Sequence, residues 1–86
     1  MSINIKVLGA QCSKCKKLER ITNEVVKDHG YDANVEKIED LDKIMSYGFL
    51  YIPALVINEK VIFNGRVPSK TEIKTILDKI NNELNV

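Results

Sequence analysis

The feature that most constrains the fold is a long amphipathic stretch between Ser13 and His29. Its apolar residues recur every three or four positions and so form one stripe along a helix: Cys15, Leu18, Ile21 or Thr22, Val25 and Val26. Gly30 follows where a helix C-terminal cap is expected. Residues 3–8 before the helix and 31–38 after it alternate apolar and polar side chains, as strands do. A strand, a helix and a second strand predict a parallel unit with a right-handed crossover.

The remaining half of the chain predicts a short helix, a hairpin and a final helix. Asp40 suits the N-cap of the short helix, whose apolar positions are Leu41, Ile44 and Met45. Residues 54–57 and 61–63 are typical of two strands joined by a tight turn. Ser69 and Glu72 have the spacing of a capping box before the last helix. The order β-α-β-α-β-β-α predicts an α/β fold in a single domain over residues 1–86, with a four-stranded mixed sheet flanked by three helices.

Two local features depart from this simple pattern. The hairpin turn carries Asn58-Glu59, and glutamate is unfavourable at positive φ. We therefore expect a turn type other than that of an Asn-Gly hairpin. Asn4 and Lys6 place polar atoms on the second face of what should be a central strand. We expect that face to be covered only in part, by the short helix alone.

The composition excludes several classes of function. The 86 residues are 44% hydrophobic and 29% charged, with a formal net charge of +1. Nucleic-acid and membrane-surface proteins usually carry a basic excess, so neither role is expected. No apolar run approaches the roughly 18 residues of a spanning helix, and Met1-Ser2 leads into a strand rather than a signal peptide. We therefore expect a cytoplasmic protein, in which a cysteine pair is more often catalytic or metal-binding than structural.

Cys12 and Cys15 are the only cysteines, and their Cys-x-x-Cys spacing at a helix start brings the sulfurs within bonding reach. Cys12 would sit at the N-cap or first helical position, where free N–H groups and the helix dipole favour the reactive thiolate. Lys14, with Lys16 and Lys17, adds positive charge nearby, and Lys14 is the expected modulating residue. Cys15 lies on the apolar stripe and should be more buried. This asymmetry assigns attack to Cys12 and resolution to Cys15.

A metal-binding interpretation of the same two cysteines stays open. Residues 10–15, AQCSKC, resemble the Met-x-Cys-x-x-Cys loop of heavy-metal-binding domains, with Gln11 in place of Met. Tetrahedral zinc needs four ligands, and His29, the only histidine, lies roughly 25 Å away along the helix. One chain cannot close such a site, although a dimer could. The alternatives are therefore a copper- or zinc-trafficking module, a dimer bridging an iron–sulfur cluster, and a redox-inert adaptor.

Two stretches together resemble a known family. KVLGAQCSKCKKLE (6–19) and IPALVIN (52–58) are similar to the small thioredoxin-like proteins described as redox-active disulfide proteins. The element order is that of the thioredoxin fold in its minimal, glutaredoxin-sized form. The resemblance implies that Cys12 is the nucleophile, that Cys15 is the resolving thiol and that the two form the redox disulfide. It also implies that Pro53 is a cis-proline facing them.

The implied activity is thiol–disulfide oxidoreduction. The backbone of Ile52 would pair with the substrate chain, and Tyr51 would belong to a hydrophobic rim against which a protein substrate presses. The expected partners are disulfide-containing proteins and a thioredoxin-reductase-like electron donor. We expect no organic cofactor, no metal, no nucleic acid, no membrane, and a monomer.

The sequence departs from the family pattern at three points. It has no Trp before the cysteines, and its first strand offers Asn4 and Lys6 where thioredoxins carry a buried acid. Residues 63–70, FNGRVPSK, lack the Asp that glutaredoxins use for glutathione.

Overall fold

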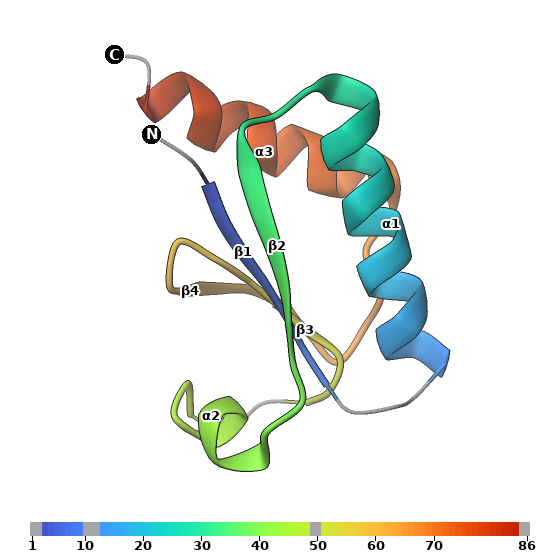
Figure 1. Cartoon of the computed structure of the whole chain (residues 1–86), viewed down its shortest axis with the longest axis vertical. Coiled ribbons are helices and arrows are strands. Elements are labelled where there is room, and N and C mark those ends of the chain that lie inside the picture. Colours follow the sequence, from blue (N-terminus) through green and yellow to red (C-terminus); the bar gives the residue numbers. More distant parts are fainter. Residues whose placement is uncertain (1–2, 10–12, 49–50, 85–86) are drawn as a thin grey trace.

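The computed structural model describes residues 3–9, 13–48 and 51–84, and its elements follow the predicted order. Figure 1 shows how they are arranged. The elements are β1 (Ile3–Leu8), α1 (Ser13–His29), β2 (Ala33–Ile38), α2 (Leu41–Met45), β3 (Ala54–Ile57), β4 (Lys60–Asn64) and α3 (Lys70–Leu84). No helix in these ranges is long and apolar enough to cross a membrane.

The four strands form one mixed sheet in the order β2-β1-β3-β4. β1 runs parallel to β2 and antiparallel to β3, and β3 and β4 form the antiparallel hairpin. Leu8, the last residue of β1, is paired with Ile38 on one side and with Ala54 on the other. The end of β1, the end of β2 and the start of β3 therefore meet at one edge of the sheet, which is where α1 begins and where Pro53 lies.

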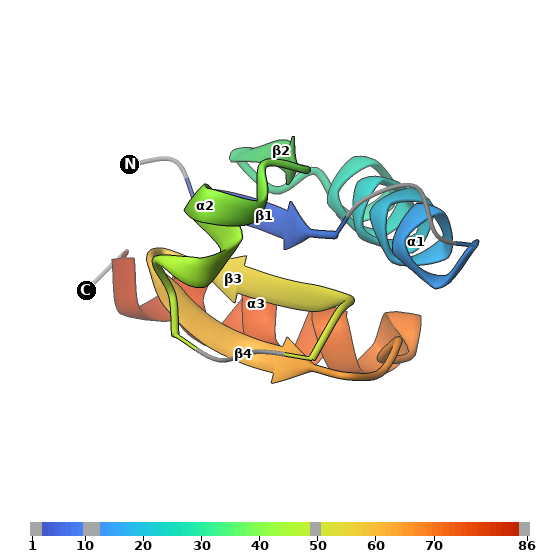
Figure 2. The same cartoon turned by 90° about the horizontal axis from the view of Figure 1, so that it is seen from below.

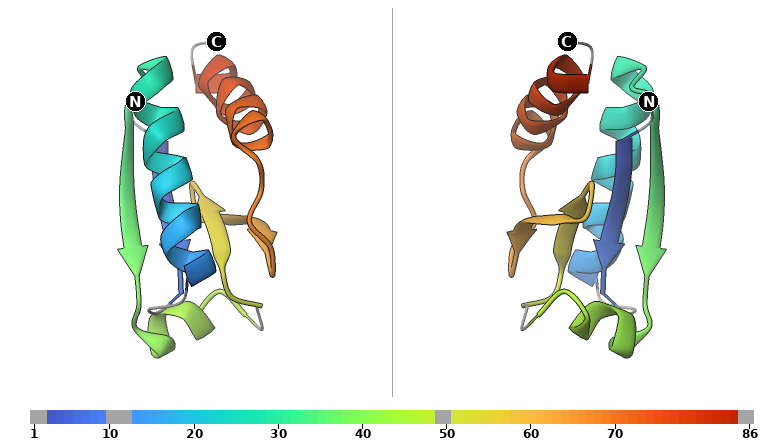
Figure 3. Two further views of the ribbon diagram at one scale, coloured as in Figure 1. Left: turned by 90° about the vertical axis from the view of Figure 1, so that its right-hand side faces the viewer. Right: turned by 90° about the vertical axis from the view of Figure 1, so that its left-hand side faces the viewer.

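The main core lies between one face of the sheet and the helices α1 and α3, which lie side by side (Figure 3). Its buried members are Ile3, Ile5, Val7, Leu18, Ile21, Val25, Leu55, Ile57, Ile73 and Leu77. Full burial of one such side chain stabilises the fold by about 1.5–3 kcal/mol. Thr22 is also fully buried, and its hydroxyl donates to the carbonyl of Leu18 at 2.7 Å. The stripe predicted from the sequence is thus the surface that α1 buries.

The second face of the sheet carries a smaller cluster, to which α2 contributes Ile44. Figure 2 shows the position of α2 from below. Its buried members are Leu8, Ile38, Ile44, Ala54 and Val56. Asn4 is exposed and Lys6 is half-buried. The prediction that the short helix covers this face only in part is confirmed.

Local hydrogen bonds explain where the helices begin and end. Gly30, at φ 65°, ends α1, and the N–H of Tyr31 donates to the carbonyl of Val26 at 3.2 Å, which is the Schellman arrangement. The Asp40 carboxylate accepts from the first N–H groups of α2. The Ser69 hydroxyl accepts from the N–H of Glu72 at 3.2 Å. β2 begins at Ala33 rather than Tyr31, since Tyr31 still belongs to the cap of α1.

The expectation for the hairpin turn was wrong. Asn58 and Glu59 both have positive φ, 50° and 66°, which is the combination that a type I′ turn requires. The Glu59 carboxylate accepts from Lys6 Nζ at 2.7 Å and from the Tyr47 hydroxyl at 3.2 Å. Asn58 accepts from the N–H of Asn4 at 3.0 Å and donates its own N–H to the Asn4 carbonyl at 2.8 Å. Contacts with β1 and with the end of α2 therefore hold glutamate in a conformation that its local preference disfavours.

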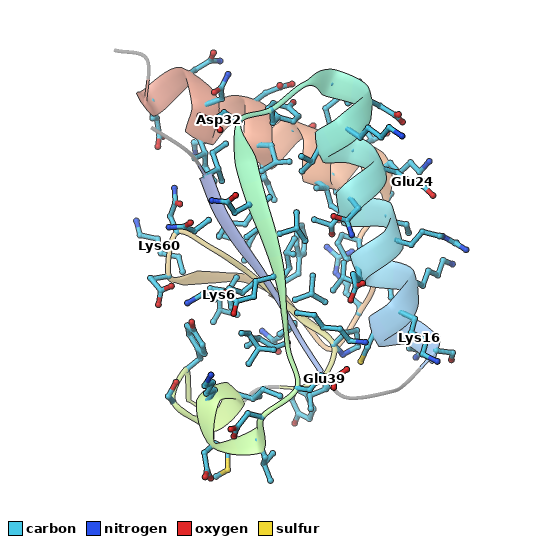
Figure 4. All side chains as sticks on the ribbon, viewed as in Figure 1. Lys6, Lys16, Glu24, Asp32, Glu39 and Lys60 are labelled. Atoms are coloured by element: carbon cyan, nitrogen blue, oxygen red, sulfur yellow. The ribbon has the colours of Figure 1, made fainter. Side chains whose placement is uncertain are left out.

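The same contacts shift two pKa values. The hydrogen bond with Lys6 lowers the pKa of Glu59, and the hydrogen bonds with Glu59 and then Tyr47 raise the pKa of Lys6. Figure 4 shows Lys6 projecting from β1 on the side away from α1. The strand in which thioredoxins carry a buried acid thus holds, at Lys6, a partly exposed cation paired with a carboxylate.

Candidate functional site

Cys15 lies in the first turn of α1, and its side chain is fully buried. Its sulfur is held in a disulfide. The sequence predicted a buried position for Cys15 from its place on the apolar stripe. Cys12 lies outside the described residues, so its role as nucleophile stays a prediction.

Gly9, directly after β1, has no side chain, and atoms of Cys15 and Ile52 occupy the space that a side chain would fill. A Cβ atom at Gly9 would approach Cys15 Sγ to less than 3.0 Å and Ile52 Cγ2 to 2.7 Å. Real Cβ atoms essentially never approach other atoms so closely. The N–H of Gly9 also donates to the carbonyl of Ile38 at 3.0 Å, which fixes it to the end of β2. Residues far apart in the sequence, Cys15 and Ile52, therefore meet against the backbone of Gly9.

The loop before β3 carries the other predicted site residues. The peptide bond between Ile52 and Pro53 is cis, as the resemblance implied, and Pro53 is fully buried. Ile52 is 43% exposed and Tyr51 is 78% exposed. Neither the N–H nor the carbonyl of Ile52 is hydrogen-bonded to another described backbone group. The residue before a buried proline is thus a partly exposed apolar residue whose side chain meets the Cys15 sulfur at Gly9.

Gly65, just after β4, anchors this loop. Its N–H donates to the carbonyls of Tyr51 and Pro53, both at 2.9 Å. Its φ is 78°, and a Cβ atom there would lie 3.0 Å from Tyr51 Cβ. Glycine is needed at this position both for the positive φ and for the close approach to Tyr51.

The charged side chains at the start of α1 are all positive. Lys14, Lys16 and Lys17 are all exposed, and the first turn of the helix contains no acidic residue. None of the three forms an ion pair with a described carboxylate. Their charge adds to that of the helix dipole, which is positive at this end and favours a nearby anion. A modulating role for Lys14 stays a prediction.

The structure brings together most of the site that the sequence predicted, and adds two glycines to it. Cys15 and Ile52 meet at Gly9, and Tyr51 and Pro53 are fixed by Gly65. The signal for Gly9 was a glycine between a strand and the cysteine pair. The signal for Gly65 was the dipeptide Asn64-Gly65, which predicted a turn but not its contact with Tyr51. In the part of the chain that the structure describes, no three His, Cys, Asp or Glu side chains gather as metal ligands would.

Comparison with known proteins finds similarity to thioredoxins at the level of the family model, of individual sequences and of solved structures. A family model for a thioredoxin domain matches residues 3–78. A thioredoxin of Methanothermobacter thermautotrophicus is 40% identical over 75 residues, covering 87% of this chain and 97% of the relative. A thioredoxin of Methanocaldococcus jannaschii is 30% identical over 70 residues, covering 81% of this chain and 80% of the relative. Among solved structures, chloroplastic thioredoxin z superposes with a TM-score of 0.73 at 21% identity, covering 94% of this chain and 80% of that one, which shows the fold.

Proposed function

Because this chain belongs to the thioredoxin family of thiol–disulfide oxidoreductases, we propose that it reduces disulfides in other proteins by dithiol exchange through the motif Cys12-Ser-Lys-Cys15. The observation that carries this proposal is the position of the Cys15 sulfur. It is buried at the start of α1 and packed against Gly9 together with Ile52, the residue before the buried Pro53. A thiol in that position is protected from solvent but lies next to an exposed docking residue.

The exchange has two steps. The Cys12 thiolate attacks one sulfur of the partner's disulfide, that S–S bond breaks, and the released partner thiolate takes up a proton. Cys15 then loses its proton and attacks the Cys12 sulfur, which breaks the mixed disulfide and releases the second partner thiolate. Two electrons pass from the dithiol to the partner, and the chain is left with a Cys12–Cys15 disulfide.

The surroundings of the motif favour this assignment of roles. The first N–H groups of α1 have no partner within the helix, so they and the helix dipole stabilise a thiolate just before it. The lysines of the first turn add positive charge, and Lys14 lies between the two cysteines in the sequence. Cys15 is fully buried and therefore suited to react within the chain rather than with a partner.

The substrate would lie across the loop before β3. The backbone groups of Ile52 have no described backbone partner, so an extended substrate segment can pair with them as an added strand. The exposed ring of Tyr51 would cover the apolar side chains of that segment. The role of Pro53 is to hold Ile52 in place beside Cys15.

We further propose that residues 1–86 act as one domain in the cytoplasm and need no organic cofactor. Electrons would come from a separate, thioredoxin-reductase-like donor that reduces the Cys12–Cys15 disulfide.

A pair of single-cysteine variants tests the proposal. Cys12→Ser should abolish disulfide reduction, because no attacking thiolate remains. Cys15→Ser should attack once and then stall, so it should accumulate a covalent adduct with a disulfide substrate. The adduct is visible on a non-reducing gel and is cleared by dithiothreitol. A metal-binding module predicts instead that each substitution removes one ligand and that neither traps a partner, so equal behaviour of the two variants would reject dithiol exchange.

A further inference from the structure

The exposed large apolar residues of the described chain are concentrated in one segment. They are Leu41 (62% exposed), Met45 (54%), Tyr51 (78%) and Ile52 (43%). Single exposed apolar side chains scattered over a surface need no explanation, but a group of them does. Tyr51 and Ile52 already belong to the proposed substrate site. Leu41 and Met45, on α2, do not.

The sequence pattern of α2 makes these two residues unexpected. Leu41, Ile44 and Met45 have the spacing of a stripe that a helix buries. In the structure only Ile44 enters the core, with 4% of its surface exposed. Leu41 and Met45 are one turn apart and leave their side chains largely in water. The attachment of α2 therefore depends on Ile44 and on the half-buried Tyr47, and not on the other two apolar residues.

This exposed pair lies at the reactive end of the sheet. α2 follows Ile38, the last residue of β2, and Ile38 accepts the hydrogen bond from Gly9. Figure 4 shows Lys16, at the start of α1, and Glu39, just before α2, at the same end of the molecule. Figure 3 shows α2 at the bottom of the molecule, at the end where α1 begins. The cysteine helix, the loop before β3 and α2 thus border the same end of the fold.

We propose that the outer face of α2, formed by Leu41 and Met45, is a recognition surface for a protein partner whose own disulfide is exchanged at Cys12 and Cys15. The inference rests on the proposed function. The partner presents apolar side chains to Leu41 and Met45, and carboxylates to the lysines at the start of α1.

Charge argues for the acidic part of this partner. Lys14, Lys16 and Lys17 are exposed and form no ion pair with a described carboxylate. The same is true of Lys27, Lys43, Lys60 and Lys79, but only the three at the start of α1 follow one another closely in the sequence, in a first turn without an acid. A group of exposed cations at the same end of the fold as an apolar surface attracts an acidic partner and speeds its association at low salt. Of the acids near α2, Asp40 caps that helix and Glu39 pairs with Lys37 at 3.0 Å, whereas the exposed Asp42 forms no ion pair with a described cation.

The recognition surface would also make the protein discriminate between polypeptide substrates and small disulfide compounds. A small disulfide compound has no side chains beside its disulfide with which to contact Leu41 and Met45. A polypeptide does have such side chains, and they can contact α2 while its disulfide meets the cysteines. The recognition surface should therefore affect reactions with polypeptides and leave reactions with small compounds unchanged.

The test uses two disulfide-closed peptides of equal length and one small compound, hydroxyethyl disulfide, with dithiothreitol as electron donor. One peptide carries leucines and glutamates beside the bridge, and the other carries serines at those positions. The double variant Leu41→Gln, Met45→Gln keeps good helix formers on α2 but removes the apolar surface. The control variant exchanges the two residues, Leu41→Met with Met45→Leu, and keeps it.

The unmodified chain should reduce the leucine-glutamate peptide with a kcat/KM roughly tenfold above that of the serine peptide, in line with truncation of interface anchors. The glutamine variant should lose that preference, the exchange variant should keep it, and all three should reduce hydroxyethyl disulfide equally. The preference should also shrink as sodium chloride is added. Urea unfolding should give the three chains similar midpoints.

Three results would overturn the inference in distinguishable ways. If the unmodified chain reduces all substrates but shows no preference between the peptides, α2 is not a recognition surface. If the glutamine variant also reduces hydroxyethyl disulfide more slowly than the unmodified chain, Leu41 and Met45 act through the fold or the cysteines and not through contact with a partner. If sedimentation shows a dimer of the unmodified chain that the glutamine variant lacks, the surface binds a second copy instead. A chain inactive towards every disulfide would reject the proposed function itself.

Discussion

Substitution of Gly9 by alanine is the sharpest test of how the site is packed. The φ of Gly9 is 150°, which L-residues rarely adopt, and the added methyl would meet Cys15 Sγ and Ile52 Cγ2 at less than 3.0 Å. The backbone conformation costs about 1–3 kcal/mol for a residue with a Cβ. The crowding costs about 1–3 kcal/mol more, because the fully buried Cys15 has little room to move.

Gly30→Ala is the matched control. Gly30 also has positive φ, 65°, but a Cβ atom there would find no other atom within 4 Å. This variant therefore carries only the conformational cost, about 1–2 kcal/mol. The combined cost at Gly9 is about 2–6 kcal/mol, against a total stability of about 4–13 kcal/mol for 86 residues.

Urea and thermal unfolding, both under dithiothreitol, measure the two costs. Each kcal/mol should lower the Tm by about 4–8 °C in a domain of this size. We expect the loss of Gly9→Ala to exceed that of Gly30→Ala by at least about 1 kcal/mol. Equal losses would mean that Cys15 and Ile52 do not press on Gly9 and would refute the packing described for the site.

Two further predictions concern the core and the pH dependence of stability. Leu55 is fully buried in β3, so Leu55→Ala should lower the free energy of unfolding by about 2–5 kcal/mol, measured by urea denaturation. Burial, followed by a hydrogen bond to Asp78, raises the pKa of Tyr31 to about 12. A raised pKa in the folded state means that the stabilisation is complete below the unfolded value of about 10 and is lost as the pH rises from there towards 12. Tyr31→Phe should remove that loss, and an unchanged alkaline profile in Tyr31→Phe would contradict the assignment.

The element order could be predicted because its signals are local. The stripe in α1 and the glycine after it define a helix whose bounds, Ser13–His29, agree with the structure. Asp40 and Ser69 mark the starts of α2 and α3 by hydrogen bonds within their own helices. Each of these signals lies within a few residues of the feature that it predicts. The buried position of Cys15 could be predicted for the same reason, since it follows from the apolar stripe of its own helix.

The turn at Asn58-Glu59 could not be predicted from local preference. The contacts that hold Glu59 at positive φ come from Lys6, in β1, and from Tyr47, after α2. Neither partner is near Glu59 in the sequence. The exposure of Leu41 and Met45 was also missed, because their spacing reports that a helix forms but not how many of its apolar residues reach the core.

Gly9 and Gly65 show why part of the site has no sequence signal of its own. Both contribute through the absence of a Cβ, and an absent side chain adds nothing to a pattern of apolar and polar positions. What each glycine allows depends on atoms from elsewhere in the chain: Cys15 and Ile52 at Gly9, and Tyr51 at Gly65. Those atoms are brought together only when β1, β3 and β4 lie in one sheet. The two glycines therefore link the fold to the proposed chemistry. The folded sheet and α1 bring Ile52 and the Cys15 sulfur to the Cα of Gly9, and the sheet brings Tyr51 to Gly65.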